Sequence, residues 1–279
     1  MIHFIVNPNS GTYSAKKRAR ILENLQAIPD SKVWQTKRVN HASTLAKQAI
    51  REGAHKIIAI GGDGTINEVA SALLYSSIPL GIIPLGSGNG LARHLKIPLN
   101  FQKALLRAIN GQEITIDAGK WNDRPFFCTA GVGFDAYVAT HFATRGKRGF
   151  LNYLYSSLVL LFLYKPIIVK EFGPLFSLTV ANANQFGNNA FISPNSSLQD
   201  GLLEVIRIKP SNLYQIIILG ISLFSKKLPQ NSQSEVSTET SLTFHASLGI
   251  PYHLDGESLR IEKEKNLISI LPACLLVVK

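Results

Sequence analysis

The segment Gly-Gly-Asp-Gly-Thr at 61–65 carries the residue types best suited to phosphate chemistry, and it separates an apolar strand pattern from a helix pattern. Glycines allow a sharp turn and leave room for a phosphate chain against bare backbone N–H groups. The helix N-terminus that follows adds a positive dipole end and unpaired donors, which favour an anion. Asp63 would repel phosphates unless Mg²⁺ stood between them, so we interpret this turn as a nucleotide-phosphate and metal site rather than an ordinary strand-to-helix turn. The residues expected to contact nucleotide here are Gly61, Gly62, Gly64, Thr65, Asn67 and Glu68.

Two further polar turns follow strand patterns in the same half of the chain: Asn-Pro-Asn-Ser-Gly at 7–11 and Pro-Leu-Gly-Ser-Gly-Asn-Gly at 84–90. Each alone is also compatible with a simple strand-ending turn. Because ligands of parallel α/β sheets bind at the carboxyl ends of the strands, we expect the three turns to share one nucleotide site. Thr36, at the end of the second strand pattern, is expected to add a hydroxyl. The other nucleotide contacts expected are Asn7, Pro8, Asn9, Ser10, Gly11, Gly86, Ser87, Gly88 and Asn89.

Strand and helix patterns alternate at short intervals as far as about residue 115, and this alternation predicts a parallel sheet covered by helices on both faces. The expected strands are 2–6, 32–36, 56–60 and 80–84, and the expected helices are 15–28, 42–51, 65–75 and 101–109.

After residue 117 the pattern changes to short apolar runs separated by turns, which predicts an antiparallel β-sandwich. One helix, 150–163, is expected to interrupt it, and the polar segment 230–240 is interpreted as a solvated loop. The predicted domains are an α/β nucleotide-binding domain, 1–117, and a β-sandwich domain, 118–266. Residues 267–279 are a candidate for a strand that returns to the first domain.

The net charge of +11 favours a negative partner, such as a nucleotide, a nucleic acid or an acidic membrane. No helix-turn-helix, zinc-finger or RNP-like pattern is present, so we expect no nucleic-acid partner. The longest apolar stretches, 158–163 and 216–224, are too short to span a bilayer, and the first residues have the pattern of a core strand rather than a signal peptide. We expect a cytoplasmic protein, and a peripheral position on the inner membrane face is compatible with this expectation.

The motifs, taken in order, resemble the catalytic domain of the diacylglycerol kinase family. The three turns match Asn-Pro-x-Ser-Gly, Gly-Gly-Asp-Gly-Thr-x-x-Glu-Val and Pro-x-Gly-Ser-Gly-Asn-x-x-Ala-Arg, whereas they fit neither a Walker loop nor Gly-x-Gly-x-x-Gly. Segments 130–136, 193–205 and 254–257 resemble later motifs of that family. The resemblance spans residues 7–257 and is greatest to single-chain bacterial lipid kinases and to sphingosine kinases.

This resemblance implies transfer of phosphate from ATP, with Mg²⁺, to the hydroxyl of a lipid such as diacylglycerol or a sphingoid lipid at a membrane surface. It assigns the general base to Glu257 and places Asp63 in the phosphate and Mg²⁺ loop. It also implies a structural Mg²⁺ held by Asp200 with main-chain carbonyls near Ser197 and Leu202. The resemblance implies that the second domain binds the lipid. It is compatible with either a monomer or a homodimer.

Two alternatives remain open at this point. A NAD kinase-like or other small-alcohol kinase would keep Asp63 and ATP, and a non-catalytic lipid- or nucleotide-binding protein would keep only the binding surfaces. Gly90, where bacterial diacylglycerol kinases usually carry Asp, keeps the second alternative alive. The apolar stripe of helix 150–163, preceded by Arg145, Lys147 and Arg148, is interpreted either as packing on the sandwich or as docking on an anionic membrane.

Overall fold

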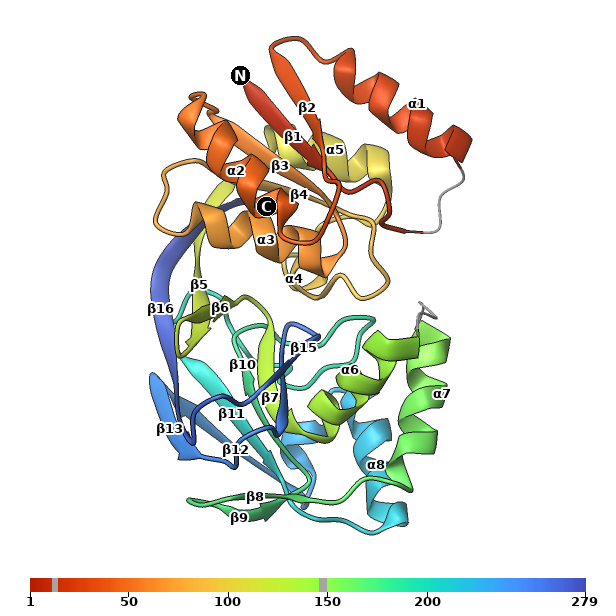
Figure 1. Cartoon of the computed structure of the whole chain (residues 1–279), viewed down its shortest axis with the longest axis vertical. Helices are drawn as coiled ribbons and strands as arrows, with labels where there is room; N and C mark the ends of the chain where they lie inside the picture. Colours follow the sequence, from red (N-terminus) through yellow and green to blue (C-terminus); the bar gives the residue numbers. More distant parts are fainter. Residues whose placement is uncertain (12–14, 146–149) are drawn as a thin grey trace. The chain divides into compact units, whose positions relative to one another are not determined.

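The chain divides into two compact units, Met1–Ile116 with Ala273–Lys279 and Asp117–Pro272 (Figure 1). The structure is a computed structural model that describes residues 1–11, 15–145 and 150–279. Lys147 and Arg148, two of the basic residues that precede the helix expected at 150–163, lie outside the described residues.

The first unit is built on a parallel sheet in the order β2-β1-β3-β4, and the end of the chain adds a further parallel strand next to β4 through Val277 and Leu80. All residues of β3 and β4 are buried, as expected for central strands with helices on both faces. The strands are β1 (Ile2–Val6), β2 (Ser31–Gln35), β3 (Lys56–Gly61), β4 (Leu80–Pro84) and the last part of β16 (Lys265–Val278).

The helices of this unit bury apolar stripes against the sheet. In α3 the buried side chains include Ile66, Val69, Ala70 and Leu73, which recur at helical spacing. The predicted helix began at Thr65, whereas α3 begins two residues earlier, at Asp63. The helices are α1 (Ala15–Gln26), α2 (His41–Arg51), α3 (Asp63–Leu73), α4 (Gly90–His94) and α5 (Phe101–Asn110).

The second unit contains a six-stranded antiparallel sheet in the order β12-β11-β10-β7-β14-β15. Its apolar face packs in one core with Trp121, whose ring lies 5.4 Å from Phe244 and 4.6 Å from Tyr252. The predicted fold class, a parallel α/β domain followed by an antiparallel β domain, is confirmed. The strands are β5 (Glu113–Trp121), β6 (Arg124–Phe126), β7 (Thr129–Gly133), β8 (Ile167–Val169), β9 (Gly173–Leu175), β10 (Ser177–Ala181), β11 (Leu203–Ile208), β12 (Ser234–Glu239), β13 (Ser241–His245), β14 (Pro251–Leu254) and β15 (Glu257–Arg260).

Three α-helices occur among the described residues of this unit, so the prediction of one helix is wrong. They are α6 (Phe134–Arg145), α7 (Phe150–Leu161) and α8 (Leu213–Phe224), all labelled in Figure 1. A short 3₁₀ helix follows at Leu228–Gln230. Helix α8 is apolar almost all round, so no polar face indicates its period. Its capping box was the available signal: Asn212 accepts from the Gln215 amide at 3.0 Å and Gln215 accepts from the Asn212 amide at 2.9 Å.

The interpretation of 230–240 as a solvated loop is also wrong, because β12 occupies Ser234–Glu239 and pairs with β11 along its length. It is an edge strand in which polar side chains face solvent, and Val236 packs against the core opposite Ile206. In the described part of the chain, none of the helices has the length and apolar character needed to cross a bilayer.

Candidate active site

The structure brings the three polar turns of the first unit together. The Gly62 amide donates to Ser10 Oγ at 3.2 Å, and Asn7 Nδ2 donates to Thr65 Oγ1 at 3.0 Å, so the 7–11 turn is fixed to the 61–65 turn. A Cβ on Gly86 would lie 2.7 Å from the Cα of Gly62, so the 84–90 turn contacts the same backbone. This contact requires a glycine at position 86.

Gly64 has a different reason to be glycine. A Cβ at this position would meet no atom within 4 Å, so protein packing leaves it free, in contrast to Gly86. Gly64 is an exposed residue in the first turn of α3, whose N-cap residue, Gly62, makes no side-chain capping hydrogen bond. Open space in front of a helix N-terminus without a side-chain cap is suited to a phosphate group.

Asp63 joins two of the turns through both of its carboxylate oxygens. Oδ2 accepts from the Asn89 amide and Oδ1 from the Gly90 amide, each at 2.8 Å. Burial raises the pKa of Asp63, and the hydrogen bonds from these two amides act against that rise. The side chain therefore holds the start of α4 in place. A lone pair that these hydrogen bonds leave unused is what the carboxylate could offer to Mg²⁺ or to water bound to that ion.

Several of the residues predicted to contact nucleotide have structural partners. Glu68 accepts from the amides of Asn40 at 3.0 Å and Ala42 at 2.8 Å, and so caps the start of α2. Thr36 is buried directly after the end of β2, and its amide donates to the Val6 carbonyl. Further contacts of this kind are Asn9 N to Asn7 Oδ1, Arg18 Nη1 to the Pro8 carbonyl, Asn89 Nδ2 to the Gly86 carbonyl and Arg93 Nε to the Gly88 carbonyl.

The remaining predicted contacts lie in the same turns. Gly61 is the last residue of β3, and a Cβ there would lie 2.6 Å from the Cβ of Thr65. Gly11 has φ +75° and lies against the Leu85 carbonyl, where a Cβ would be 2.8 Å away. Ser87 is exposed and Asn67 is half-buried in α3.

Glu257 lies in the second unit, on a hairpin whose turn is held by its own aspartate. Asp255 and Gly256 both have positive φ, 50° and 84°, which is the backbone of a tight two-residue hairpin turn. The Asp255 carboxylate accepts from the three amides of Phe127, Cys128 and Thr129 at 2.7–2.8 Å. Asp255 and Gly256 thus form a hairpin turn. Glu257 directly follows this turn, and its side chain is exposed at the start of β15.

His253 is not among the site residues predicted from the sequence, and the structure places its side chain in a buried contact. The side chain is 2% exposed, and its Nε2 lies 3.1 Å from Asp135 Oδ2. Side chains of a strand alternate between its two faces, and Tyr252 and Leu254 of β14 belong to the core. This alternation was the available signal that His253 faces the opposite side. That other side is the one on which α6 packs against β14 and β15.

The predicted metal loop, 197–202, is exposed at Asp200 and anchored at its ends. Asp200 Oδ1 accepts from the Leu202 amide at 3.1 Å, Ser197 Oγ accepts from the Gln199 amide at 3.2 Å, and the Gly201 amide donates to buried Asp117 at 2.8 Å. No group of three or more His, Cys, Asp or Glu side chains suited to a metal is found among the described residues. One carboxylate with main-chain carbonyls is still an oxygen donor set of the kind that Mg²⁺ takes.

Comparison with known proteins identifies the family. Residues 1–121 match the diacylglycerol kinase catalytic domain, and residues 128–279 match the YegS C-terminal NAD kinase β-sandwich-like domain. The chain belongs to the YegS-like family of lipid kinases. The predicted resemblance is confirmed: the first matched domain of this lipid kinase contains the three turns and Asp63, and the second contains Asp200 and Glu257.

Two relatives agree with this identification, and two solved structures share the fold. The chain is 32% identical over 260 residues to a protein named "Probable lipid kinase YegS-like" from Yersinia enterocolitica, covering 86% of this chain and 84% of that protein. A protein of the same name from Pectobacterium atrosepticum is 30% identical over 248 residues, with 84% and 81% covered. A Bacillus anthracis structure titled as a diacylglycerol kinase has a TM-score of 0.74 at 20% identity, covering 99% of this chain and 96% of that one. A second structure from that organism has a TM-score of 0.80 at 22% identity, with 99% and 94% covered, so both show the shared fold.

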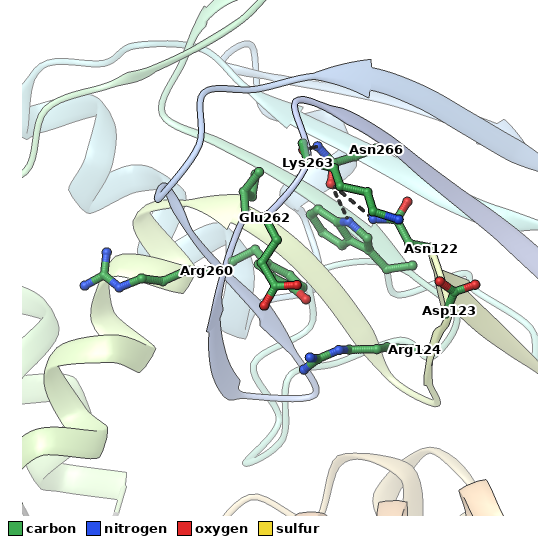
Figure 2. A pocket seen from close by; sticks show the side chains of 10 residues that line it. Asn122, Asp123, Arg124, Arg260, Glu262, Lys263 and Asn266 are labelled. Atoms are coloured by element: carbon green, nitrogen blue, oxygen red, sulfur yellow. Dashed lines mark hydrogen bonds between the residues drawn. The ribbon is translucent and has the colours of Figure 1, made fainter.

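A hollow of about 80 Å³ lies elsewhere in the second unit of this lipid kinase (Figure 2). Trp121 is one of its lining residues, and Trp121 Nε1 donates to Asn266 Oδ1 at 3.0 Å. Ligand pockets for drug-sized molecules are typically about 300–1,000 Å³, so this hollow is too small for ATP or an acyl chain. None of the predicted site residues lines it. Its walls are formed by Trp121, Asn122, Asp123, Arg124, Tyr252, Arg260, Ile261, Glu262, Lys263 and Asn266.

Proposed function

We propose that this lipid kinase transfers the γ-phosphate of ATP to the hydroxyl of a lipid such as diacylglycerol or a sphingoid lipid. One observation carries the proposal: three polar turns meet at the N-terminus of α3, where the space in front of Gly64 is open. Membership of a lipid kinase family supplies the reaction class, and the arrangement of the turns supplies a place for the donor's phosphates.

In this proposal the first unit binds the donor. The first-turn amides of α3 and the side chains of Ser10 and Ser87 contact phosphate oxygens, and Asp63 keeps the 84–90 turn against the 61–65 turn. When bound, Mg²⁺ neutralises charge on the phosphates of ATP. Asp63 would lie beside that ion, and Asp200 with the carbonyls of Ser197 and Leu202 would hold a second, structural one.

The second unit supplies the base in this proposal. A lipid hydroxyl is a weak acid, so its proton must be accepted as the new P–O bond forms. Glu257 suits this step because its side chain is exposed while its backbone is fixed by the Asp255 turn. It would accept the proton by a hydrogen bond to the hydroxyl and would remain on the enzyme as a neutral carboxylic acid until the proton is released to water.

The test is transfer of labelled γ-phosphate from ATP to a total lipid extract, with and without Mg²⁺, followed by mass identification of the product. We expect a labelled lipid that forms only with Mg²⁺. Labelled NADP⁺ formed from NAD⁺, with no labelled lipid, would instead establish the NAD kinase-like alternative. ATP binding without transfer to any acceptor would establish the binding-protein alternative and direct attention to Gly90.

We also propose that α7 and α8 contact the membrane that holds the lipid. The exposed side of α7 and the residues just after it present Tyr155, Leu158 and 75%-exposed Phe162, and α8 presents 72%-exposed Tyr214, Ile217 and 63%-exposed Ile221. Both helices pack their other side into one core cluster, through Leu161 of α7 and Ile216, Leu219 and Leu223 of α8.

The charges beside these helices favour an anionic surface. Segments 150–170 and 209–230 contain no Asp or Glu, and their charged residues are Lys165, Lys170, Lys209, Lys226 and Lys227. Each lysine near an anionic bilayer contributes about 1 kcal/mol of attraction, and exposed apolar side chains add to it by entering the interface. The proposed position is therefore peripheral, on the inner membrane face.

Changing Ile217 and Ile221 together to Glu is expected to weaken binding to phosphatidylglycerol vesicles at least tenfold, because two charges replace apolar side chains on the contacting face. Vesicle sedimentation at low and high salt measures this, with Leu106→Glu as the control, since Leu106 is an equally exposed apolar residue (64%) on α5. Activity on a short-chain acceptor in solution should persist in both variants. Unchanged vesicle binding, or a dimer in analytical ultracentrifugation that only the double variant loses, would contradict the membrane assignment.

A further inference from the structure

We propose that His253 and Asp135 are positioning residues that hold the turn bearing Glu257. The inference rests on the proposed function of Glu257 as the base. The side chains of both residues are largely buried, and the proposed reaction gives neither of them a contact with ATP or with the lipid.

The His253 ring bridges a carboxylate and a backbone amide. Nε2 lies 3.1 Å from Asp135 Oδ2, and Nδ1 lies 3.4 Å from the Gly256 amide nitrogen. A carboxylate can only accept and a backbone N–H can only donate, so one neutral tautomer satisfies both contacts. In that tautomer Nε2–H donates to Asp135, and unprotonated Nδ1 accepts from Gly256, the residue directly before Glu257.

Asp135 is itself held firmly. Its Oδ1 accepts from the Ala136 amide at 2.8 Å at the start of α6, and its Oδ2 also accepts from Thr179 Oγ1 at 2.8 Å. Gly131 makes room for the pair, because a Cβ there would lie 2.7 Å from Asp135 Oδ2 and 3.2 Å from His253 Nε2. The carboxylate therefore forms a fixed point between α6, β10 and β14, to which the histidine ties the turn.

The hairpin is thus held on both sides of Glu257. Asp255 fixes the first residue of the turn to the amides of residues 127–129, and His253 holds the second residue, Gly256. Beyond Glu257, Ser258 Oγ lies 2.6 Å from Thr140 Oγ1 of α6. A base must be within hydrogen-bond distance of the proton it accepts, and a misplacement of about 1 Å can cost about 10²-fold in rate. Fixing the backbone on both sides is the means by which an exposed side chain can keep that position.

Two conservative variants separate the two contacts of the ring. In His253→Asn, Oδ1 takes the place of Nδ1, so the acceptor for Gly256 is kept and the donor to Asp135 is lost. In His253→Gln, the amide Nε2 takes the place of the ring Nε2, so the donor to Asp135 is kept and the acceptor for Gly256 is lost. If the residue acts through the turn, His253→Gln should lower kcat about 10- to 100-fold without changing the KM for ATP, whereas His253→Asn should keep kcat within about threefold.

The experiment measures kcat, KM and melting temperature for both variants, for Glu257→Gln and for the double variant His253→Gln with Glu257→Gln. A positioning role predicts that the double variant is no slower than Glu257→Gln, since the turn then has no base left to position. A buried histidine that only fills the core would lower the melting temperature in both variants and reduce kcat equally, which would overturn the inference. A further loss of rate in the double variant would overturn it as well.

The failure of this inference can be told from the failure of the proposed function. If Glu257→Gln is as active as the unmodified protein, the base assignment fails and the positioning inference fails with it. If Glu257→Gln is inactive while His253→Gln has unchanged kcat, the base assignment stands and only the positioning inference is overturned.

Discussion

Replacing Glu257 with Gln is expected to lower kcat by about 10²–10⁴-fold, the usual contribution of a general base. Glutamine keeps the shape and hydrogen-bonding reach of the side chain but cannot accept the proton of the lipid hydroxyl. Because the residue is exposed and the turn is fixed by Asp255 and not by Glu257, the melting temperature should not change. Transfer of labelled phosphate from ATP to the identified lipid measures the rate.

The KM for ATP is a second readout of the same variant. The proposal assigns the donor to the three turns of the first unit, so the KM for ATP should be unchanged while kcat falls. Glu239→Gln, at an exposed position at the end of β12, is the matched control and should retain full activity. Full activity in Glu257→Gln would require another group to accept the proton, and the base assignment would then be withdrawn.

The meeting of the three turns follows from sequence because it depends on a general property of parallel sheets. Each turn directly follows a strand, and the carboxyl ends of parallel strands lie at one edge. The contacts within the site do not follow in the same way. Glu68 stands in the same motif as Asp63, yet its carboxylate caps α2, because the amides at 40 and 42 come from a segment more than twenty residues away.

His253 and α8 show a second limit. The pairing of His253 with Asp135 joins residues 118 positions apart, and no local pattern indicates which histidine meets which carboxylate. Helix α8 has apolar residues on nearly every side, so its period is hidden and the capping box at Asn212 is the only local sign. Local periodicity predicts a helix when one of its faces is apolar and the other is polar. In α8 the exposed face, which we assign to the membrane, is apolar as well.

Changing Asp63 to Asn is expected to lower kcat/KM for ATP by about 10- to 100-fold and, in contrast to Glu257→Gln, to raise the KM for ATP. In the structure each carboxylate oxygen accepts one amide at 2.8 Å, from Asn89 and from Gly90. Asparagine replaces one of these oxygens with an NH₂ group, which places a donor against a donor. A hydrogen bond to a charged group contributes about 1.5–3 kcal/mol, and each 1.4 kcal/mol corresponds to about tenfold.

The two variants therefore separate two kinds of carboxylate in one enzyme. In our proposal Glu257 contacts the lipid hydroxyl, whereas Asp63 holds the 84–90 turn against the 61–65 turn. Loss of the Asp63 carboxylate should therefore affect ATP binding and turnover together. Isothermal titration with a non-hydrolysable ATP analogue measures the binding part, and Glu23→Gln on the exposed side of α1 is the control. If Asp63→Asn binds the analogue as tightly as the unmodified protein and loses only turnover, the bracing role is wrong. The carboxylate would then act through Mg²⁺ on the transferred phosphate, which is the role that the family resemblance assigns to it.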